Sequence, residues 1–169
     1  ERLILCESAP NVRTMLAGRF GGNRKIVVRR PEDIAMMSPG SLDTIVMHSV
    51  AQYMSAEELD SVLRRFRRLL KRGGLLVLGD VIPRRYPALG DAIALLNFGS
   101  DEGFYWAALR GLFRTYFSDY RQLRKSLGIA RYSEDEITAK LEAAGFSVQR
   151  ARTNIGHNRR RMTFLGHVR

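Results

Sequence analysis

Two apolar segments in the middle of the chain, residues 42–47 and 75–78, each end in polar side chains. The first is followed by His48, Ser49, Gln52 and Tyr53, and the second by Asp80. An imidazole titrates near neutral pH, so His48 is a candidate general base, and Tyr53 is a second catalytic candidate. Because ligands bind beyond the carboxyl ends of parallel strands, Ser49, Gln52 and Asp80 are candidate substrate contacts. The alternative is that His48 only closes the end of a strand.

The elements that position these residues follow from capping and periodicity. Ser55 and Glu58 form a capping box, and apolar residues then recur at helical spacing as far as Leu70. The pair Gly73-Gly74 is predicted to end this helix, and residues 75–78 to form the next strand. The region is therefore predicted to fold as a strand, a helix and a second strand.

The N-terminal part of the chain shows the same alternation. Residues 2–7 and 25–29 are short apolar runs typical of buried strands. A helix between them begins near Pro10 and ends after Phe20, and residues 30–34 are predicted to form a loop.

A second capping box, Ser133 with Glu136, opens a helix that ends at Gly145. Residues 146–153 and 162–168 are predicted to pair as an antiparallel hairpin, because a short connection containing glycine joins them.

Residues 84–132 are too long for an ordinary connection, and their composition is helical and rich in aromatic residues. We predict a helical lid inserted into a single domain that spans residues 1–169. The candidate walls of an apolar acceptor pocket are Tyr105, Trp106, Tyr116 and Tyr120. The alternative is that these aromatic residues pack as core. His157, between the last two strands, either reaches the same face or is an ordinary loop residue.

The composition excludes several classes of protein. The 169 residues include 28 Lys and Arg against 17 Asp and Glu, a net charge of +11, but the basic residues are spread along the chain. A nucleic-acid partner is therefore an alternative that we do not favour. A single cysteine cannot form an internal disulfide, no cluster has the spacing of a metal site, and no apolar run reaches the ~20 residues of a membrane span. A cytoplasmic protein is expected, of undetermined oligomeric state.

Three segments resemble the class I S-adenosylmethionine-dependent methyltransferases. Residues 41–48 resemble the fourth strand of that family, and residues 133–146 resemble the helix before its sixth strand. Residues 69–80, Leu-Leu-Lys-Arg-Gly-Gly-Leu-Leu-Val-Leu-Gly-Asp, resemble its passage into the fifth strand, with Arg72 in place of a proline. The resemblance implies an α/β, Rossmann-like three-layer sandwich with a mostly parallel sheet and a C-terminal antiparallel hairpin.

The resemblance also implies S-adenosylmethionine as cofactor. The family's second strand normally ends in an acidic residue that holds the ribose hydroxyls, and Glu7, followed by Ser8, lies at that place. Arg30 stands at about the place of the acidic residue that meets the adenine, so either Glu32 or Asp33 substitutes for it or the adenine contact is lost. His48 is a further cofactor-binding candidate. The alternative for Glu7 is a solvated strand end.

The family's first strand and its glycine-rich cofactor loop have no counterpart in this sequence. That strand lies between strands two and four of the family's sheet, so its absence leaves two unpaired backbone edges, which are costly when buried. We therefore expect residues upstream of Glu1 to supply it.

Three functions are consistent with these patterns. The leading hypothesis is methyl transfer from S-adenosylmethionine to a small-molecule or lipid-like acceptor. The second is an RNA methyltransferase that uses the basic surface. The third is a catalytically degenerate methyltransferase-like domain that serves as a binding or partner subunit, which becomes the favoured reading if Glu1 is the true start of the protein.

Overall fold

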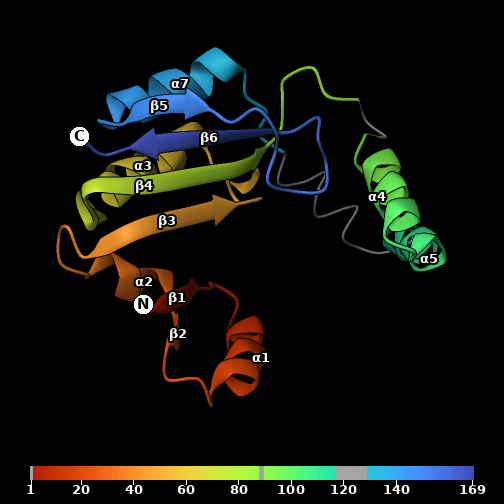
Figure 1. Cartoon of the computed structure of the whole chain (residues 1–169), viewed down its shortest axis with the longest axis horizontal. Helices are drawn as coiled ribbons and strands as arrows, with labels where there is room; N and C mark the ends of the chain where they lie inside the picture. The colour runs from red at the N-terminus through yellow and green to blue at the C-terminus, as the bar shows by residue number, and fades with distance from the viewer. Residues whose placement is uncertain (1, 88–89, 117–128) are drawn as a thin grey trace.

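The structure is a computed structural model that describes residues 2–87, 90–116 and 129–169. Figure 1 shows strands and helices in alternation, with the carboxyl ends of β1, β3 and β4 on the same side. The elements are β1 (Leu3–Cys6), α1 (Pro10–Phe20), β2 (Ile26–Arg29), α2 (Pro31–Ala35), β3 (Leu42–His48), a 3-10 turn η1 (Ala51–Tyr53), α3 (Ala56–Leu69), β4 (Leu70–Val81), α4 (Gly90–Asp101), α5 (Tyr105–Tyr116), α7 (Glu134–Ala143), β5 (Ser147–Arg150) and β6 (Met162–His167).

The core lies beneath a four-stranded sheet with the order β3-β4-β6-β5. β3 and β4 are parallel, and β6 is antiparallel to both of its neighbours, as the predicted C-terminal hairpin requires. The helices α3 and α7 cover one face, where alternate strand residues such as Leu76, Leu78 and Phe164 are fully buried. On the other face Val46 of β3 remains 61% exposed. The α/β class predicted from the sequence is confirmed.

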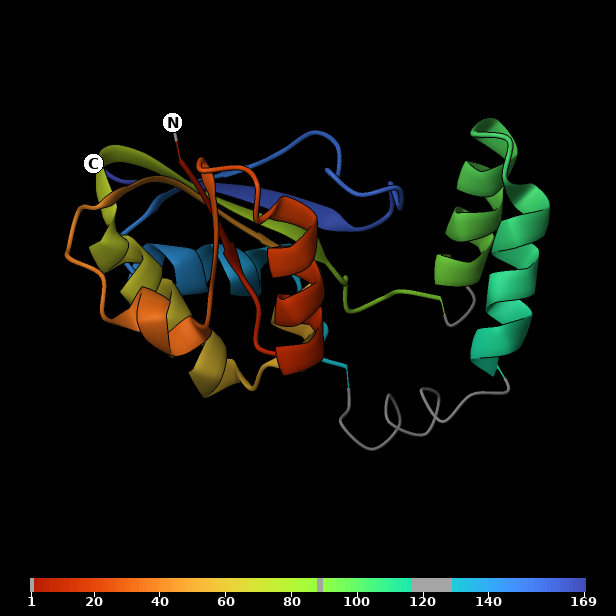
Figure 2. The same ribbon diagram turned by 90° about the horizontal axis from the view of Figure 1, so that it is seen from below.

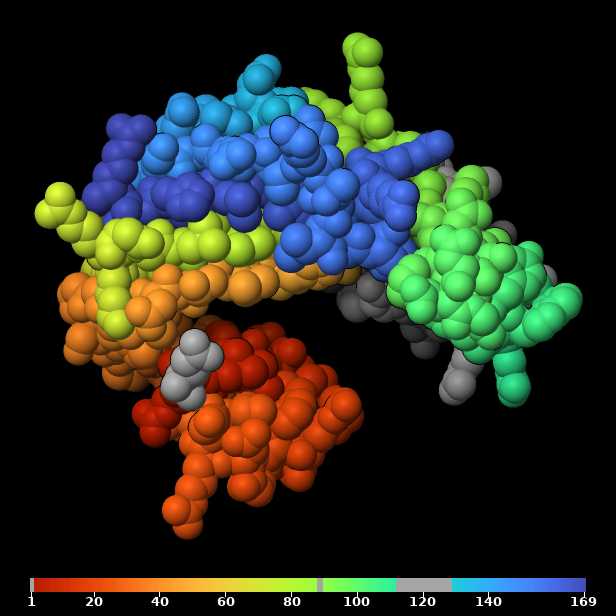
Figure 3. Space-filling model, viewed as in Figure 1, coloured from red at the N-terminus to blue at the C-terminus, as the bar shows by residue number. Residues whose placement is uncertain are grey.

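β1 and β2 form a separate parallel pair. Among the described residues, no strand pairs with the edge of β1 that faces away from β2, or with the free edge of β3. The space-filling view shows a hollow between the red and orange N-terminal segment and β3 (Figure 3). Among the described residues, the sheet is thus divided between β1 and β3, the position where the resemblance predicts a missing central strand.

Both predicted capping boxes are present. The Ser55 hydroxyl accepts the Glu58 N–H at 3.2 Å, and the Glu58 carboxylate accepts the Ser55 N–H at 2.7 Å. Ser133 and Glu136 exchange the same two bonds at 3.2 and 2.6 Å. Each pair satisfies N–H groups that a helix start otherwise leaves unpaired, so α3 and α7 begin where the sequence predicts.

Two local predictions were wrong. Residues 30–34 are not a loop, because Pro31 begins the short helix α2 and the Asp33 carboxylate accepts the Arg30 N–H. Gly73 and Gly74 do not end α3, which stops at Leu69. They lie inside β4, where Gly73 has φ +75° and the pairing with β3 shifts register. The glycines therefore form a bulge in the strand.

Residues 84–132 leave the sheet and return to it at one place. The Arg84 N–H donates to the Tyr132 carbonyl at 3.1 Å, and the Tyr132 N–H donates to the Ile82 carbonyl at 3.0 Å. Between these ends, α4 and α5 form a helical pair that stands beyond the carboxyl ends of the strands (Figures 1 and 2). The helical character predicted for this segment is confirmed for α4 and α5.

Candidate active site

Ser49 and Asp80 lie side by side at the carboxyl ends of two adjacent parallel strands. The register of β3 and β4 pairs His48 with Gly79, which places the next residue of each strand together. Both have left-handed backbone angles, with φ of 58° for Ser49 and 64° for Asp80. Left-handed non-glycine residues each cost about 1–3 kcal/mol and cluster at functional sites. The Ser49 N–H donates to the Gly79 carbonyl at 3.1 Å, which holds this bend.

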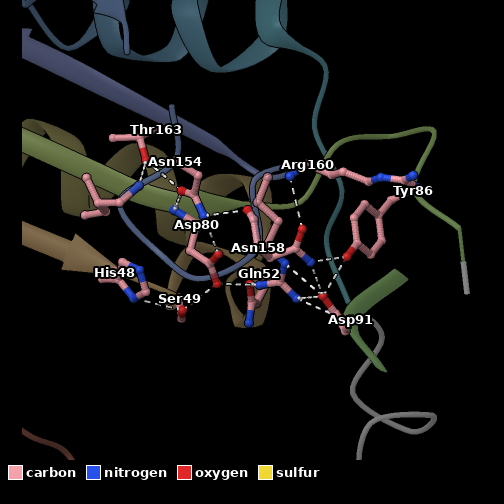
Figure 4. A network of polar contacts seen from close by, with 12 residues as sticks. His48, Ser49, Gln52, Asp80, Tyr86, Asp91, Asn154, Asn158, Arg160 and Thr163 are labelled. Atoms are coloured by element: carbon pink, nitrogen blue, oxygen red, sulfur yellow. Dashed lines mark hydrogen bonds and ion pairs between the residues drawn. The ribbon is translucent and has the colours of Figure 1, made fainter. Parts of the chain in front are cut away.

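A chain of hydrogen bonds joins His48, Ser49 and Asp80 (Figure 4). The Ser49 hydroxyl donates to Asp80 Oδ2 at 2.6 Å and lies 3.0 Å from His48 Nδ1. An ionised carboxylate only accepts, so the single hydroxyl proton belongs to the bond with Asp80. The Ser49 oxygen must then accept from Nδ1–H, which leaves the lone pair of neutral His48 on Nε2. The chain therefore selects the tautomer in which Nε2 can take up a proton.

The remaining oxygen of Asp80 is held by the loop between β5 and β6. Asn154 Nδ2 donates to Asp80 Oδ1 at 3.0 Å, and Asn154 Oδ1 accepts the Asp80 N–H at 3.1 Å. The Thr163 hydroxyl donates to the same Asn154 oxygen at 2.7 Å. Gly156 lies against this cluster, since a Cβ there would be 3.1 Å from both Asp80 Oδ1 and His48 Nε2. The loop thus fixes the carboxylate and borders the base.

Arg161 links Asp80 to α4. Its Nη1 donates to Asp80 Oδ2 at 2.5 Å, and its Nη2 donates to both oxygens of Asp91, at the start of α4, at 2.7 Å. The Arg161 and Asp80 side chains are each only 8% exposed. Burial lowers the pKa of Arg161, but hydrogen bonds to Asp91 and the charge of Asp80 outweigh it and raise the pKa. The guanidinium therefore stays charged between the two carboxylates.

Asp91 has further partners that fix its orientation. The Tyr86 hydroxyl donates to Asp91 Oδ1 at 2.8 Å, and Asn158 Nδ2 donates to it at 3.0 Å. Burial raises the pKa of Asp91, but hydrogen bonds from Arg161 and Tyr86 outweigh this effect and hold the pKa below its ordinary value. Burial is also the main cause of the raised pKa of Tyr86, so its hydroxyl remains a donor.

A cavity of about 740 Å³ lies between α4 and the loop after β5. Its lining consists of Gly90, Ile93, Ala94, Asn97, Phe98, Asp101, Glu102, Thr153, Asn154, Gly156, His157, Asn158, Arg159 and Arg160. The rings of Phe98 and His157 bridge its two walls with centroids 5.6 Å apart. Ligand pockets commonly hold about 300–1,000 Å³, so the cavity has the size of a small-molecule site. Asn154 connects it to the hydrogen bonds around Asp80.

Glu7 and Ser8 follow β1, at the position predicted for the ribose contact. The Ala9 N–H and the Ser8 hydroxyl donate to Glu7 Oε1 at 2.8 and 3.4 Å. Among the described residues no hydrogen bond reaches Glu7 Oε2. A free carboxylate oxygen can accept from two hydroxyl groups, so the residue fits the role of holding a ribose diol.

The two acidic residues of α2, Glu32 and Asp33, differ in how closely Arg30 binds their carboxylates. Asp33 receives the Arg30 N–H at 3.1 Å and its guanidinium at 3.2 Å, and the hydrogen bond from that side chain is the main cause of a lowered pKa. Glu32 lies 4.0 Å from Arg30, with 66% of its side chain exposed. The Glu32 carboxylate is therefore the less engaged of the two, whereas Asp33 lines a cavity beside β1 and β2.

The predicted acceptor residues divide into separate groups. Gln52 is buried and its Oε1 accepts from Arg161 at 3.4 Å, whereas Tyr53 is 49% exposed in η1. Tyr105 and Trp106 form an edge-to-face pair on the lid, with Trp106 77% exposed, and neither lines the cavity. His157 does line it. The side chain of Tyr116 and the whole of Tyr120 lie outside the described residues.

The residues that tie the site together were missed by sequence reasoning. The sequence showed Arg161 only as one of many basic residues spread along the chain, and Asn154 and Asn158 only as members of a short connection between two strands. Asp91 and Tyr86 lie in the segment treated only as a helical insertion. The one available signal was the pair of asparagines in a loop beside a strand end, since asparagine side chains commonly bond to nearby backbone.

Within residues 2–87, 90–116 and 129–169 there is no group of three or more His, Cys, Asp or Glu that could hold a metal ion. None of the helices in these ranges is long and apolar enough to cross a bilayer.

The fold is that of the class I, Rossmann-like methyltransferases, which confirms the fold that the resemblance implied. Residues 1–78 match the family described as "Methyltransferase domain". Chondramide synthase cmdD of Chondromyces crocatus is 34% identical over an alignment 97 residues long, and the match covers 47% of this chain. A possible exported protein of Bordetella parapertussis matches 99% of the chain with a TM-score of 0.64 and 20% identity. The structure of PigF with SAH matches 99% with a TM-score of 0.61 and 18% identity.

The chain spans only part of each of these proteins. It covers 2% of the length of chondramide synthase, 53% of the Bordetella protein and 43% of PigF. At these identities the structural matches establish the fold alone.

Proposed function

We propose that the protein is an S-adenosylmethionine-dependent methyltransferase that acts on a small organic acceptor. The match of residues 1–78 to a methyltransferase domain supports the activity. The similarity to PigF, whose structure contains SAH, supports the cofactor. The similarity to a natural-product synthase supports an acceptor of the small-molecule class.

The observation that carries the proposal is the hydrogen-bonded chain from His48 through Ser49 to Asp80. When bound, S-adenosylmethionine supplies an electrophilic methyl group. The acceptor atom must lose a proton as it becomes methylated, and His48 Nε2 is the group that takes it. Ser49 fixes the tautomer of the imidazole, and Asp80 stabilises the imidazolium that results.

The residues that would hold the cofactor, in this proposal, follow the carboxyl ends of β1, β2 and β3. Glu7 Oε2 would accept the ribose hydroxyls, with Ser8 beside it, and Glu32 would accept the adenine amino group. His48, at the end of β3, would lie next to the cofactor. Because Asp33 is engaged by Arg30, it serves to hold α2 rather than the ligand.

The acceptor binds in the cavity between α4 and the loop after β5. Ile93, Ala94 and Phe98 offer an apolar wall for a carbon skeleton, and Asn97 and His157 offer polar groups. α4 then acts as a lid over the acceptor, because it forms one wall of the cavity. Ser49 and Asp80 contribute indirectly, through the hydrogen bonds that position the base.

An RNA substrate is less well supported. Several arginines that contribute to the basic charge are engaged in the fold. Arg67 donates to the Gly145 carbonyl and Arg68 to the Ala35 carbonyl, each at 2.9 Å, and Arg84 pairs with Glu136. Such residues position elements of the protein and are poorly available to phosphate groups.

The test uses the full-length natural protein, methyl-labelled S-adenosylmethionine and a small-molecule extract of the source cells. We expect label to enter a low-mass product, and His48→Gln to reduce this about 10²–10⁴-fold, the usual contribution of a general base. Affinity for S-adenosylhomocysteine, measured by calorimetry, is expected to stay unchanged in that variant. Glu7→Gln should instead weaken the binding of S-adenosylhomocysteine.

If the natural protein does not bind S-adenosylhomocysteine even at millimolar concentration, the proposed methyltransferase activity is wrong. Unchanged labelling in His48→Gln would refute only the role of the base. Label in RNA rather than in the low-mass fraction would favour the RNA methyltransferase.

A further inference from the structure

We infer that Arg161 is a positioning residue that fixes the α4 wall of the cavity to the carboxyl end of β4. This inference rests on the proposed function, because the cavity is taken as the acceptor site. Through one guanidinium, the lid is joined to the carboxylate that also anchors Ser49 and His48.

The geometry of the contact is specific to arginine. Nε and Nη2 face Asp91, with distances of 3.1 Å from Nε to Oδ1 and 2.7 Å from Nη2 to each oxygen. Nη1 faces the other way, to Asp80 and to Gln52 Oε1. The planar fork therefore spans two carboxylates from different elements, which the point charge of a lysine cannot do equally well.

Burial makes this arrangement more than a surface ion pair. The Arg161 and Asp80 side chains are 8% exposed and that of Asp91 is 33% exposed. Without the guanidinium, two carboxylates would face one another in a partly desolvated site, and their repulsion would drive α4 away. Exposed pairs contribute little to stability, whereas breaking a buried one leaves an uncompensated charge.

The neighbours of Asp91 make the start of α4 a fixed point. Tyr86 and Asn158 both donate to Asp91 Oδ1, and the Arg161 guanidinium lies 5.8 Å from the centre of the Tyr86 ring. A Cβ on Gly90 would come within 2.7 Å of the same ring, so the helix start packs closely there. Figure 4 shows Asp80 of β4, Asp91 of α4 and Asn158 of the loop after β5 converging at this place.

The remainder of α4 has a weaker hold on the body of the protein. Among the described residues, it contacts the loop across the cavity through the ring pair of Phe98 and His157. We therefore expect the contact of Arg161 with Asp91 to hold α4 in place as a wall of the cavity. The hydrogen bond from Ser49 to Asp80 places the proposed base, His48, near the same contact.

The test compares Asp91→Asn, Asp91→Glu and Arg161→Lys with a control, Arg152→Met, which removes an exposed positive charge outside the cavity lining. Amide hydrogen exchange is followed in residues 90–101 and, as an internal reference, in α7. We expect exchange in α4 to be at least tenfold faster in Asp91→Asn and Arg161→Lys, with α7 unchanged. Asp91→Glu keeps the carboxylate and should retain slow exchange in α4. Arg152→Met should exchange at the same rate as the natural protein.

Methyl transfer to the small-molecule extract provides the second measurement. A positioning role requires Asp91→Asn to reduce labelling by tenfold or more while S-adenosylhomocysteine affinity stays the same. If exchange in α4 is faster in Asp91→Asn but methyl transfer is undiminished, Arg161 has no positioning role in the reaction. If exchange in α4 is unchanged in Asp91→Asn and Arg161→Lys, the contact between Arg161 and Asp91 does not hold α4. If the natural protein labels nothing, the proposed function fails, and hydrogen exchange still decides whether Arg161 holds α4.

Discussion

The Ser49 hydroxyl donates a 2.6 Å hydrogen bond to Asp80 across the ends of β3 and β4, and both residues have left-handed backbone angles. Two such residues in contact are costly, and each is held by further bonds to its backbone or side chain. The strain is therefore concentrated where the proposed base lies, beside a cavity large enough for an acceptor.

Removing the Ser49 hydroxyl tests this relationship directly. We expect Ser49→Ala to reduce methyl transfer at least tenfold, because His48 loses the partner that selects its tautomer. Ser49→Gly removes the same hydroxyl but relieves the left-handed strain. Its free energy of unfolding should therefore be about 1–2 kcal/mol higher than that of Ser49→Ala. Denaturant unfolding measures the difference, and equal stabilities would show that the backbone is unstrained in solution.

Gly156 offers a steric test of the same cluster. A Cβ there would lie 3.0 Å from Asn154 Nδ2 and 3.1 Å from both His48 Nε2 and Asp80 Oδ1. We expect Gly156→Val to abolish most methyl transfer while leaving S-adenosylhomocysteine affinity within threefold. Gly18→Ala is the matched control, because nothing lies within 4 Å of a Cβ at that helical position. Full activity in Gly156→Val would mean that His48 Nε2 does not face this loop.

The pH dependence of lid docking follows from Asp91. Burial raises its pKa, but hydrogen bonds from Arg161 and Tyr86 outweigh it, so the folded pKa lies below the ordinary value of 3.8. A depressed pKa contributes stability that is fully present above the unfolded pKa and is lost as pH falls through the folded one. The stability difference between the natural protein and Asp91→Asn should therefore be constant above pH ~5 and shrink below 3.8. A difference that grows on acidification would contradict the assignment.

The pair of Arg84 and Glu136 at the base of the lid gives a spectroscopic test. Hydrogen bonds from Arg84 are the main cause that lowers the pKa of Glu136 from 4.5 to about 2. In Arg84→Ala we expect the carboxyl resonance of Glu136 to titrate closer to 4.5, as followed by NMR. Both side chains are solvent-accessible, so the thermal stability should change little. An unshifted titration would show that the pair does not form in solution.

Local signals explain which elements were predicted correctly. Ser55 with Glu58 and Ser133 with Glu136 satisfy N–H groups within one turn, so the starts of α3 and α7 depend only on neighbouring residues. Gly73 and Gly74 were misread because a glycine pair suits a helix end and a strand bulge equally, and pairing of β4 with β3 decides between them.

The sequence by itself determined the α/β class, the capped helices, the interrupted sheet and the placement of His48, Ser49 and Asp80 at strand ends, because these depend on periodicity, capping and chain order. Only the tertiary structure joined Asp80 to Arg161 and Asp91, residues 81 and 70 positions apart from Arg161 along the chain. Contacts of such separation have no local pattern, since they arise when β4, the lid and the loop after β5 converge. The physical reason is that a buried charge must find its partners in space, wherever the fold brings them.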